Sequence, residues 1–223
     1  MARRVVGIMA KAPVAGQAKT RLIPALGADA AARLQRQMLL DTIELTMAAL
    51  EGDGSIRIVC PKAADRAALK GLVPAEVEII AHERGDLMSG LDYALTHHLD
   101  QGYEQVVLLD ADSPTLPAHY VRSALDQLTG DAVVLGPTLD GGYYLIGACR
   151  PQPALFNWKQ MDSATICRQT HQRAEALGVR VALLPPWYDV DTAEDLERLI
   201  EELRSYPTRA PHTFSFLERD GRR

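Results

Sequence analysis

The sequence has few aromatic residues, few cysteines and no long apolar segment, and each shortage excludes a class of protein. Only 5% of the 223 residues are aromatic, but 47% are hydrophobic, which is enough for one large aliphatic core. The three cysteines, Cys60, Cys149 and Cys167, are far apart and form no Cys-x-x-Cys pair, which argues against a zinc site or a disulfide framework. No apolar run approaches the ~18 residues of a membrane span.

An excess of basic residues is also lacking. The formal net charge of −5 argues against a general nucleic-acid binder, because a phosphate backbone requires a basic surface. It does not exclude a small phosphate ligand held by a few neighbouring cations. The first residues, Met1–Arg4, lead directly into a short apolar run rather than into a signal-peptide core. We therefore expect a cytoplasmic protein without a membrane span.

Short apolar runs alternate with segments of helical periodicity along the whole chain. This alternation predicts an α/β fold, a three-layer sandwich with a mainly parallel central sheet. The first long helix is expected to have Asp29 as its N-cap and to extend to about Leu50. We expect one domain over residues 1–205. Residues 206–223 are expected to form a tail that is either disordered or packed on a partner chain, as in a homodimer.

The strongest feature is the apolar run Val106–Leu109, which stops at two carboxylates, Asp110 and Asp112. Pro114 and Pro117 prevent the strand from continuing. The two carboxylates are therefore expected at the carboxyl end of a buried parallel strand, which is the edge where open α/β sheets bind ligands. Clustered carboxylates repel each other, and a divalent cation such as Mg²⁺ or Mn²⁺ would satisfy both.

Two other interpretations of this stretch stay open. Asp112 or Thr115 could cap the helix that follows. An Asp-x-Asp pair after a strand also occurs in aspartyl-phosphate phosphatases, although there the pair follows an early strand and is not succeeded by proline.

The loop after the first expected strand carries three cations, Lys11, Lys19 and Arg21, around Gly16. Turn amides and converging cations could hold a phosphate chain, and glycine would let the backbone approach it. A solvated basic loop is the alternative. The spacing matches neither a P-loop nor a dinucleotide-binding fingerprint.

A second acidic stretch, Asp189–Asp195, precedes the last expected helix. Thr192 with Asp195, or Asp191 with Glu194, forms a capping-box pattern. A cap uses one side chain, so it cannot account for both Asp189 and Asp191. If Thr192 is the cap, Asp191 can face the other carboxylates.

A third loop contains Asp140, Gly141 and Gly142, followed by Tyr143 and Tyr144. Asp-Gly between apolar runs indicates first of all a hairpin turn. The second glycine and the tyrosine hydroxyls would also suit the close approach of a sugar or base.

These four stretches together resemble small bacterial transferases of the nucleotide-diphospho-sugar (GT-A) superfamily, relatives of the nucleotidyltransferases that make molybdopterin and deazaflavin cofactors. The resemblance covers residues 5–203. It rests on four motifs in the family's order: Lys11-x-Pro13-x-x-Gly16-x-x-Lys19-Thr20-Arg21-Leu22, Asp112-x-Pro114-x-Leu116, Gly136-Pro137-x-x-Asp140-Gly141-Gly142-Tyr143-Tyr144 and Asp189-Val190-Asp191-Thr192-x-x-Asp195-Leu196.

The resemblance implies a GT-A fold and roles by position. Four residues of the first loop would bind the nucleotide phosphates: Lys11, Gly16, Lys19 and Arg21. Of these, Lys19 and Arg21 would also act in catalysis. Asp112 and Asp191 would hold the metal, with Asp110 a lesser candidate because the family more often has glycine there. Four residues would line the donor or acceptor pocket: Asp140, Gly141, Gly142 and Tyr143.

The leading interpretation is a Mg²⁺- or Mn²⁺-dependent transferase that moves a sugar from a nucleotide-sugar to an unidentified small-molecule acceptor. The alternative is a guanylyl- or cytidylyltransferase-like reaction that releases pyrophosphate, because the Lys-Thr-Arg cluster would suit a triphosphate. A catalytically silent nucleotide-binding module is the third option. It arises because the family tends to have Gly-Asp-Leu-Gly-x-Arg where this chain has Met88 and Gly90 in place of the glycine and the arginine.

Overall fold

The computed structural model describes residues 3–157 and 163–220, and in them strands and helices alternate as predicted. The strands are β1 (Arg4–Met9), β2 (Ser55–Cys60), β3 (Glu78–Ala81), β4 (Gln105–Asp110), β5 (Val133–Pro137), β6 (Tyr143–Ala148) and β7 (Val181–Leu183). The helices are η1 (Thr20–Leu22), α1 (Ile23–Leu26), α2 (Ala28–Leu50), α3 (Ala63–Leu69), α4 (Leu87–Asp100), α5 (Ala118–Gln127), α6 (Pro153–Phe156), η2 (Ser163–Thr165), α7 (Ile166–Ala176), α8 (Ala193–Ser205), η3 (Pro207–Arg209) and α9 (Pro211–Arg219).

The strands of the described residues form one sheet in the order β3-β2-β1-β4-β6-β5-β7. Strands β1 to β4 pair in parallel, and β7 is parallel to β5. Only β6, among the strands described, runs against its neighbours, because a short turn returns the chain from β5. The prediction of an α/β fold with a mainly parallel sheet is confirmed.

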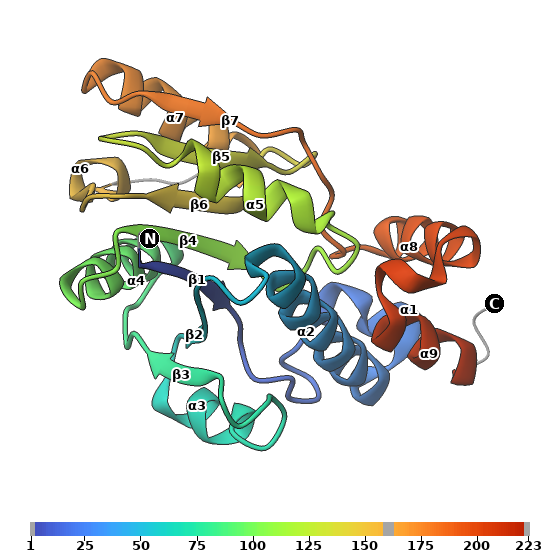
Figure 1. The fold of residues 1–223 in the computed structure, drawn as a ribbon. Coiled ribbons are helices and arrows are strands. Elements are labelled where there is room, and N and C mark those ends of the chain that lie inside the picture. The colour runs from blue at the N-terminus through green and yellow to red at the C-terminus, as the bar shows by residue number, and fades with distance from the viewer. Residues whose placement is uncertain (1–2, 158–162, 221–223) are drawn as a thin grey trace.

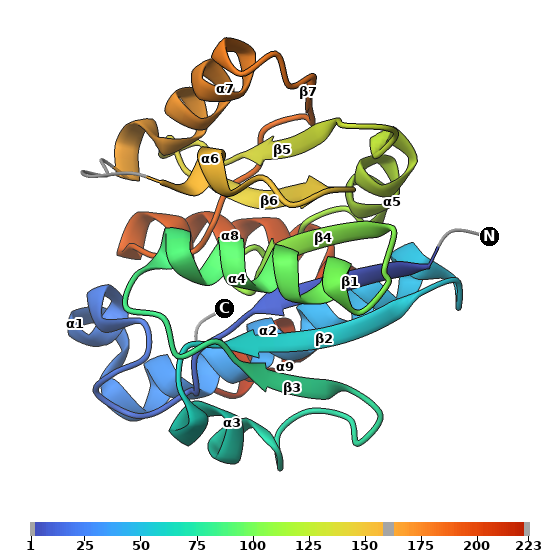
Figure 2. The same cartoon turned by 90° about the vertical axis from the view of Figure 1, so that its left-hand side faces the viewer.

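Helices cover both faces of the sheet, so that the fold has three layers (Figures 1 and 2). Successive residues of β4 face opposite sides: Val106 and Leu108 pack in the core with α4, α6 and α7, and Val107 and Leu109 pack in the core with α2 and α5. A strand that is buried on both faces has no polar side, which explains the continuous apolar run in the sequence.

The carboxyl ends of β1, β2, β3 and β4 lie at one edge of the sheet. From β1 the chain moves outward to β2 and β3, and then returns to the other side of β1 with β4. Loops after β1 and β4 consequently diverge, and this topological switch opens a crevice at the carboxyl edge. Strand β6 enters the sheet at this same edge because it runs in the opposite direction.

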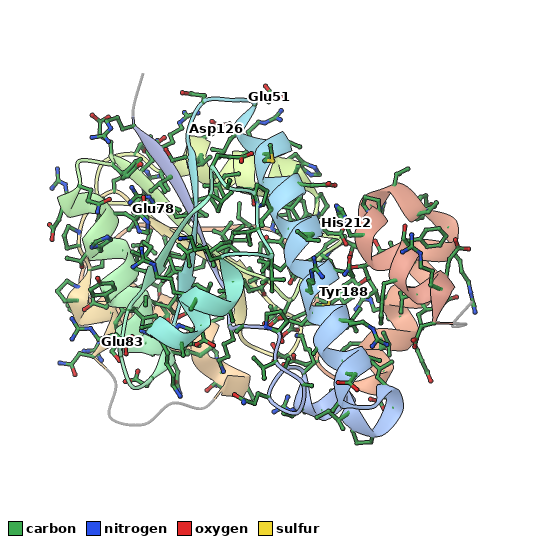
Figure 3. All side chains as sticks on the ribbon, turned by 90° about the horizontal axis from the view of Figure 1, so that it is seen from below. Glu51, Glu78, Glu83, Asp126, Tyr188 and His212 are labelled. Atoms are coloured by element: carbon green, nitrogen blue, oxygen red, sulfur yellow. The ribbon has the colours of Figure 1, made fainter. Side chains whose placement is uncertain are left out.

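The C-terminal segment is helical and packs on the domain, which differs from the tail expected after residue 205. Helix α9 lies against α2 and α8, and Leu217 is buried with Leu199 and Leu203 of α8. In Figure 3, His212 at the start of α9 lies beside α2. The apolar residues of this segment therefore cover the chain's own core.

The long helix α2 begins two residues earlier than expected. It starts at Ala28 after Gly27, whose φ of 81° breaks the preceding turn, and no side chain caps it. The expectation that Asp29 is the N-cap is wrong, because Asp29 already lies in the first helical turn. Its negative charge is still favourable there, near the positive end of the helix dipole. No described helix is both long and apolar enough to cross a membrane.

Candidate functional site

A cleft of about 750 Å³ opens at the carboxyl edge of the sheet. The loops after β1, β3, β4, β5 and β7 all contribute to its walls. Of the residues predicted to form a site, those that line the cleft are Lys11, Lys19, Arg21, Asp110, Asp112, Asp140, Gly142, Tyr143 and Asp191. Residues from four separate stretches of the sequence therefore meet in one place.

Lys19 joins the two acidic stretches of the chain. Its Nζ lies 2.7 Å from Asp112 Oδ1 and 2.8 Å from Asp191 Oδ1, and its side chain is only 4% exposed. Burial alone would lower the pKa of Lys19, but the two carboxylates outweigh burial and raise this pKa. The ammonium group is therefore a fixed positive charge between Asp112 and Asp191.

More carboxylates surround this ion pair than Lys19 can neutralise. Burial raises the pKa of Asp110 well above its usual range, and the charges of Asp112 and Asp189 raise it further. Burial, followed by the charge of Asp140, raises the pKa of Asp189 to about 6. The floor of the cleft is therefore short of positive charge.

Asp110 is partly engaged by its own loop. Its Oδ1 accepts a hydrogen bond from the Asp112 amide and its Oδ2 accepts one from the Ser113 hydroxyl, both at 3.2 Å. Neither Asp112 nor Thr115 caps the next helix, since Pro117 occupies the N-cap of α5 without a side-chain bond. The capping interpretation of this stretch is wrong.

The capping box of the second acidic stretch is confirmed. Thr192 Oγ1 accepts a bond from the Asp195 amide, and Asp195 Oδ2 accepts bonds from the Thr192 and Asp191 amides. Because Thr192 and Asp195 satisfy the helix end, the Asp191 side chain is free to bind Lys19.

Arg21 and Lys11, the other two cations of the first loop, are more exposed than Lys19. The Arg21 side chain is 72% exposed and lies 3.9 Å from Asp191 Oδ2. Lys11 is exposed at the cleft, and its carbonyl accepts a hydrogen bond from Gln35 Nε2 of α2 at 3.2 Å. Gly16 has a φ of 80° and is not among the lining residues, so it shapes the turn rather than the wall.

The third loop forms the predicted hairpin turn and divides its residues between two environments. Asp140 Oδ1 accepts bonds from Thr138 Oγ1 and from the Gly142 amide. Gly142 and Tyr143 line the cleft, whereas Gly141 does not. Gly141 has a φ of 100°, and an added Cβ would lie 2.0 Å from the Ala164 carbonyl oxygen. Its glycine is thus explained by packing on the segment that leads into α7.

Met88 and Gly90, which stand after β3 in place of the glycine and the arginine of the Gly-Asp-Leu-Gly-x-Arg pattern, both pack against neighbouring side chains. Met88 is buried, and its sulfur accepts a hydrogen bond from the Tyr143 hydroxyl at 3.4 Å. A Cβ at Gly90 would lie 2.9 Å from two ring atoms of His82, so the histidine fills the space beside this glycine.

Several polar residues that line the cleft were not selected as site candidates in the sequence, among them Asp189, His82 and Arg84. Asp189 carried a usable signal, because it stands two residues before Asp191, and in an extended segment residues at that spacing point to the same side. His82 and Arg84 carried none, since an isolated histidine or arginine in a loop has no distinctive spacing.

The residues of the cleft fit a hard divalent cation. Their donors are carboxylate oxygens, which Mg²⁺ and Mn²⁺ prefer, and Lys19 contacts only one oxygen of Asp112 and one of Asp191 at hydrogen-bond distance. Asp110, Asp112 and Asp191 are not gathered within 4.8 Å of one another, whereas in the described part of the chain Asp41, Glu44 and His212 are. In that group, however, Asp41 accepts bonds from the amides of His212 and Thr213, which anchors α9.

Comparisons with known proteins agree with this architecture. A crystal structure of a provisionally assigned nucleotide-diphospho-sugar transferase from Desulfovibrio desulfuricans G20 superposes with a TM-score of 0.87 at 29% identity, covering 99% of this chain and 96% of that one. A nucleotidyl transferase from Methanothermobacter has the same fold, with a TM-score of 0.62, 15% identity and coverages of 91% and 99%. Rv0371c from Mycobacterium tuberculosis, crystallised with manganese, gives a TM-score of 0.53, 19% identity and coverages of 90% and 100%.

A search of curated proteins found no match to the sequence. Residues 44–165 match the model of a family described as an uncharacterized protein conserved in bacteria, DUF2064. The matched segment includes Asp110 and Asp112 at the end of β4 and the turn from Thr138 to Tyr143. The chain therefore belongs to the DUF2064 family and has the fold of nucleotide-diphospho-sugar transferases and nucleotidyltransferases.

Proposed function

We propose that this protein is a divalent-metal-dependent transferase that uses an activated nucleotide, and that it transfers a sugar from a nucleotide-sugar to a small-molecule acceptor. One observation carries the proposal. Asp112 and Asp191, far apart in the sequence, converge on Lys19 in the floor of a cleft that is also lined by Lys11 and Arg21. Carboxylates for a metal beside cations for phosphates are the combination that nucleotide chemistry requires.

In this proposal the loop residues bind and orient the nucleotide. Lys11 and Arg21 are exposed at the cleft and would contact the diphosphate oxygens. Asp112 and Asp191 would hold Mg²⁺ or Mn²⁺ through the carboxylate oxygens that do not contact Lys19, and the ion would supply positive charge to the leaving phosphate. Lys19, held between these carboxylates, would add a preorganised positive charge that strengthens in the transition state.

The second candidate is nucleotidyl transfer from a nucleoside triphosphate with release of pyrophosphate, a reaction that the fold also supports. The pairing of Lys19 favours glycosyl transfer. A triphosphate carries more negative charge than a diphosphate, and Lys19 already faces two carboxylates. Of the first-loop cations, Lys11 and Arg21 then remain for the phosphates, which matches the smaller charge of a diphosphate.

Two assays separate these reactions. The protein is incubated with Mn²⁺ and either a panel of nucleotide-sugars or a panel of nucleoside triphosphates, each with pooled sugar and sugar-phosphate acceptors. We expect release of a nucleoside diphosphate from a nucleotide-sugar. Release of pyrophosphate from a triphosphate would replace this proposal with nucleotidyl transfer.

Replacing Asp112 with alanine tests the site itself. We expect that nucleotide with Mn²⁺ stabilises the wild-type protein by about 2.7 kcal/mol at about 100 times Kd, and that Asp112→Ala removes most of this gain because the metal loses a ligand. Thermal-shift titration measures it, with and without EDTA. Asp126→Ala, whose side chain is 62% exposed on α5, is the matched control and should respond like the wild type. If Asp112→Ala keeps the metal-dependent shift, the assignment of Asp112 is wrong.

A further inference from the structure

A buried hydrogen-bond network lies behind the acidic residues and outside the cleft. Tyr188 donates a hydrogen bond from its hydroxyl to Glu202 Oε2, and Thr115 Oγ1 donates to the same oxygen at 3.1 Å. Thr115 and Tyr188 also contact each other, with their hydroxyl oxygens 3.2 Å apart. Thr115 is 2% exposed and Tyr188 is 3% exposed. None of the three residues is among those that line the cleft.

The network joins the two segments that carry the predicted metal ligands. Thr115 follows Asp112 by three residues, and Tyr188 precedes Asp191 by three residues. Between them, the Val190 amide donates a hydrogen bond to the Asp112 carbonyl at 2.9 Å. Besides the ion pairs of Lys19, the Asp112 and Asp191 segments are thus held together by this backbone bond and by the two hydroxyl groups that meet at the Glu202 carboxylate.

We infer that Glu202, through Thr115 and Tyr188, is a positioning residue for the metal site. This inference rests on the proposed function, since it assumes that Asp112 and Asp191 hold the ion. Glu202 lies on α8 and does not reach the cleft, so it would act only through the spacing of the two ligands. Hydrogen-bonded partners behind metal ligands commonly control their orientation in this way.

Contacts around Glu202 keep its carboxylate in one place. Its second oxygen, Oε1, accepts a hydrogen bond from Arg209 of η3 at 2.6 Å. The Arg198 guanidinium lies over the Tyr188 ring, 3.9 Å from its centroid. In Figure 3, Tyr188 lies beside α2 on the side of the C-terminal helices. A carboxylate that is bonded at both oxygens and mostly covered has little freedom to reorient, so it can fix the positions of both hydroxyl groups.

Mn²⁺ affinity tests this inference directly. Free Mn²⁺ is titrated by electron paramagnetic resonance against the wild type, Tyr188→Phe, Thr115→Val and Glu202→Gln, well below the Tm of each variant. We expect the three variants to raise the Kd for Mn²⁺ by about 10-fold or more, which is the effect typical of lost second-layer partners. Thr115→Ser keeps the hydroxyl and should restore affinity to within about 2-fold of the wild type.

Matched controls separate positioning from folding and from the proposed function. Glu201→Gln changes an exposed neighbour on the same helix and should leave the Kd unchanged. If the network variants lower only Tm and bind Mn²⁺ like the wild type, the network is merely structural and the inference fails. If the wild type itself does not bind Mn²⁺, or if Asp112→Ala binds it equally well, then the proposed metal site fails and the inference fails with it.

Discussion

At the scale of single residues, Gly90 of α4 packs against His82, a residue that lines the cleft. The His82 Nδ1 accepts a hydrogen bond from the Arg84 amide at 2.9 Å, and the residue is 8% exposed. Burial lowers the pKa of His82, which favours the neutral ring that can accept this bond. The histidine therefore occupies space that a side chain at residue 90 would need, and the glycine on α4 is a packing requirement.

Replacing Gly90 with alanine should change the free energy of unfolding in opposite directions depending on whether His82 is present. In the wild-type background, we expect Gly90→Ala to destabilise the protein by about 1 to 2 kcal/mol, because the clash with the His82 ring outweighs the better helix propensity of alanine. In a His82→Ala background the clash is absent, and the same change should stabilise the protein by up to ~1 kcal/mol. Urea denaturation of the four proteins measures both effects. Equal effects in the two backgrounds would show that His82 is not the obstacle.

At the scale of whole elements, helix α9 is held by a residue that is distant in the sequence. Asp41 of α2 accepts hydrogen bonds from the His212 amide at 2.9 Å and from the Thr213 amide at 2.8 Å. These two amides belong to the first turn of α9, which has no cap of its own. Asp41 thus takes the role of an N-cap residue across a helix–helix interface. Burial raises the pKa of Asp41, despite these bonds.

Removing this anchor should loosen α9. We expect Asp41→Ala to destabilise the protein by about 1 to 2 kcal/mol, because two buried amide groups lose their acceptor. Glu44→Ala is the control on the same helix. It removes the 2.7 Å contact between Glu44 and His212. Both of these side chains are exposed, so the change should lower the free energy of unfolding by at most about 1 kcal/mol. Hydrogen exchange of the α9 amides and urea denaturation measure the effect. Equal losses for both variants would contradict a special role for Asp41.

The sequence predicted correctly those elements whose packing partners and hydrogen-bond partners lie nearby in the chain or are supplied by the layers of the sheet fold. Residues 106–109 form a buried strand because both their faces are covered, and Thr192 caps α8 because its partner Asp195 is three residues away. The docking of α9 could not be predicted, because its acceptor Asp41 is distant in sequence. The start of α2 was misplaced for another reason: Gly27 ended the preceding turn through its backbone alone.

At the scale of the whole molecule, the topology of the sheet brings together more carboxylates than the fold alone can neutralise. Asp110 is the last residue of β4 and Asp112 follows it, Asp140 lies between β5 and β6, and Asp189 and Asp191 follow β7. The sequence indicated that the stretches would meet, because strand ends in a parallel sheet share an edge. It could not show that Lys19, on the loop after β1, would be inserted between two of them, since this depends on the conformation of one loop.

This excess of negative charge should make stability depend on pH. A carboxyl group whose pKa is higher in the folded than in the unfolded chain stabilises the fold at low pH, and this contribution is lost as the pH rises through the folded value. For Asp189 the pKa rises from an ordinary 3.8 to about 6, so the loss should fall between about pH 4 and pH 7.

Asp189→Asn isolates this contribution because asparagine does not titrate. In EDTA, we expect the variant to have a higher Tm than the wild type at about pH 7.5 and a similar Tm at about pH 4. Asp126→Asn, on the exposed face of α5, should show no such pH-dependent gap. If the gap between Asp189→Asn and the wild type is the same at both pH values, Asp189 is not destabilised by burial. Replacing EDTA with Mg²⁺ should narrow the difference in Tm between Asp189→Asn and the wild type at neutral pH. A cation held by Asp112 and Asp191 would offset the repulsion between these carboxylates and Asp189.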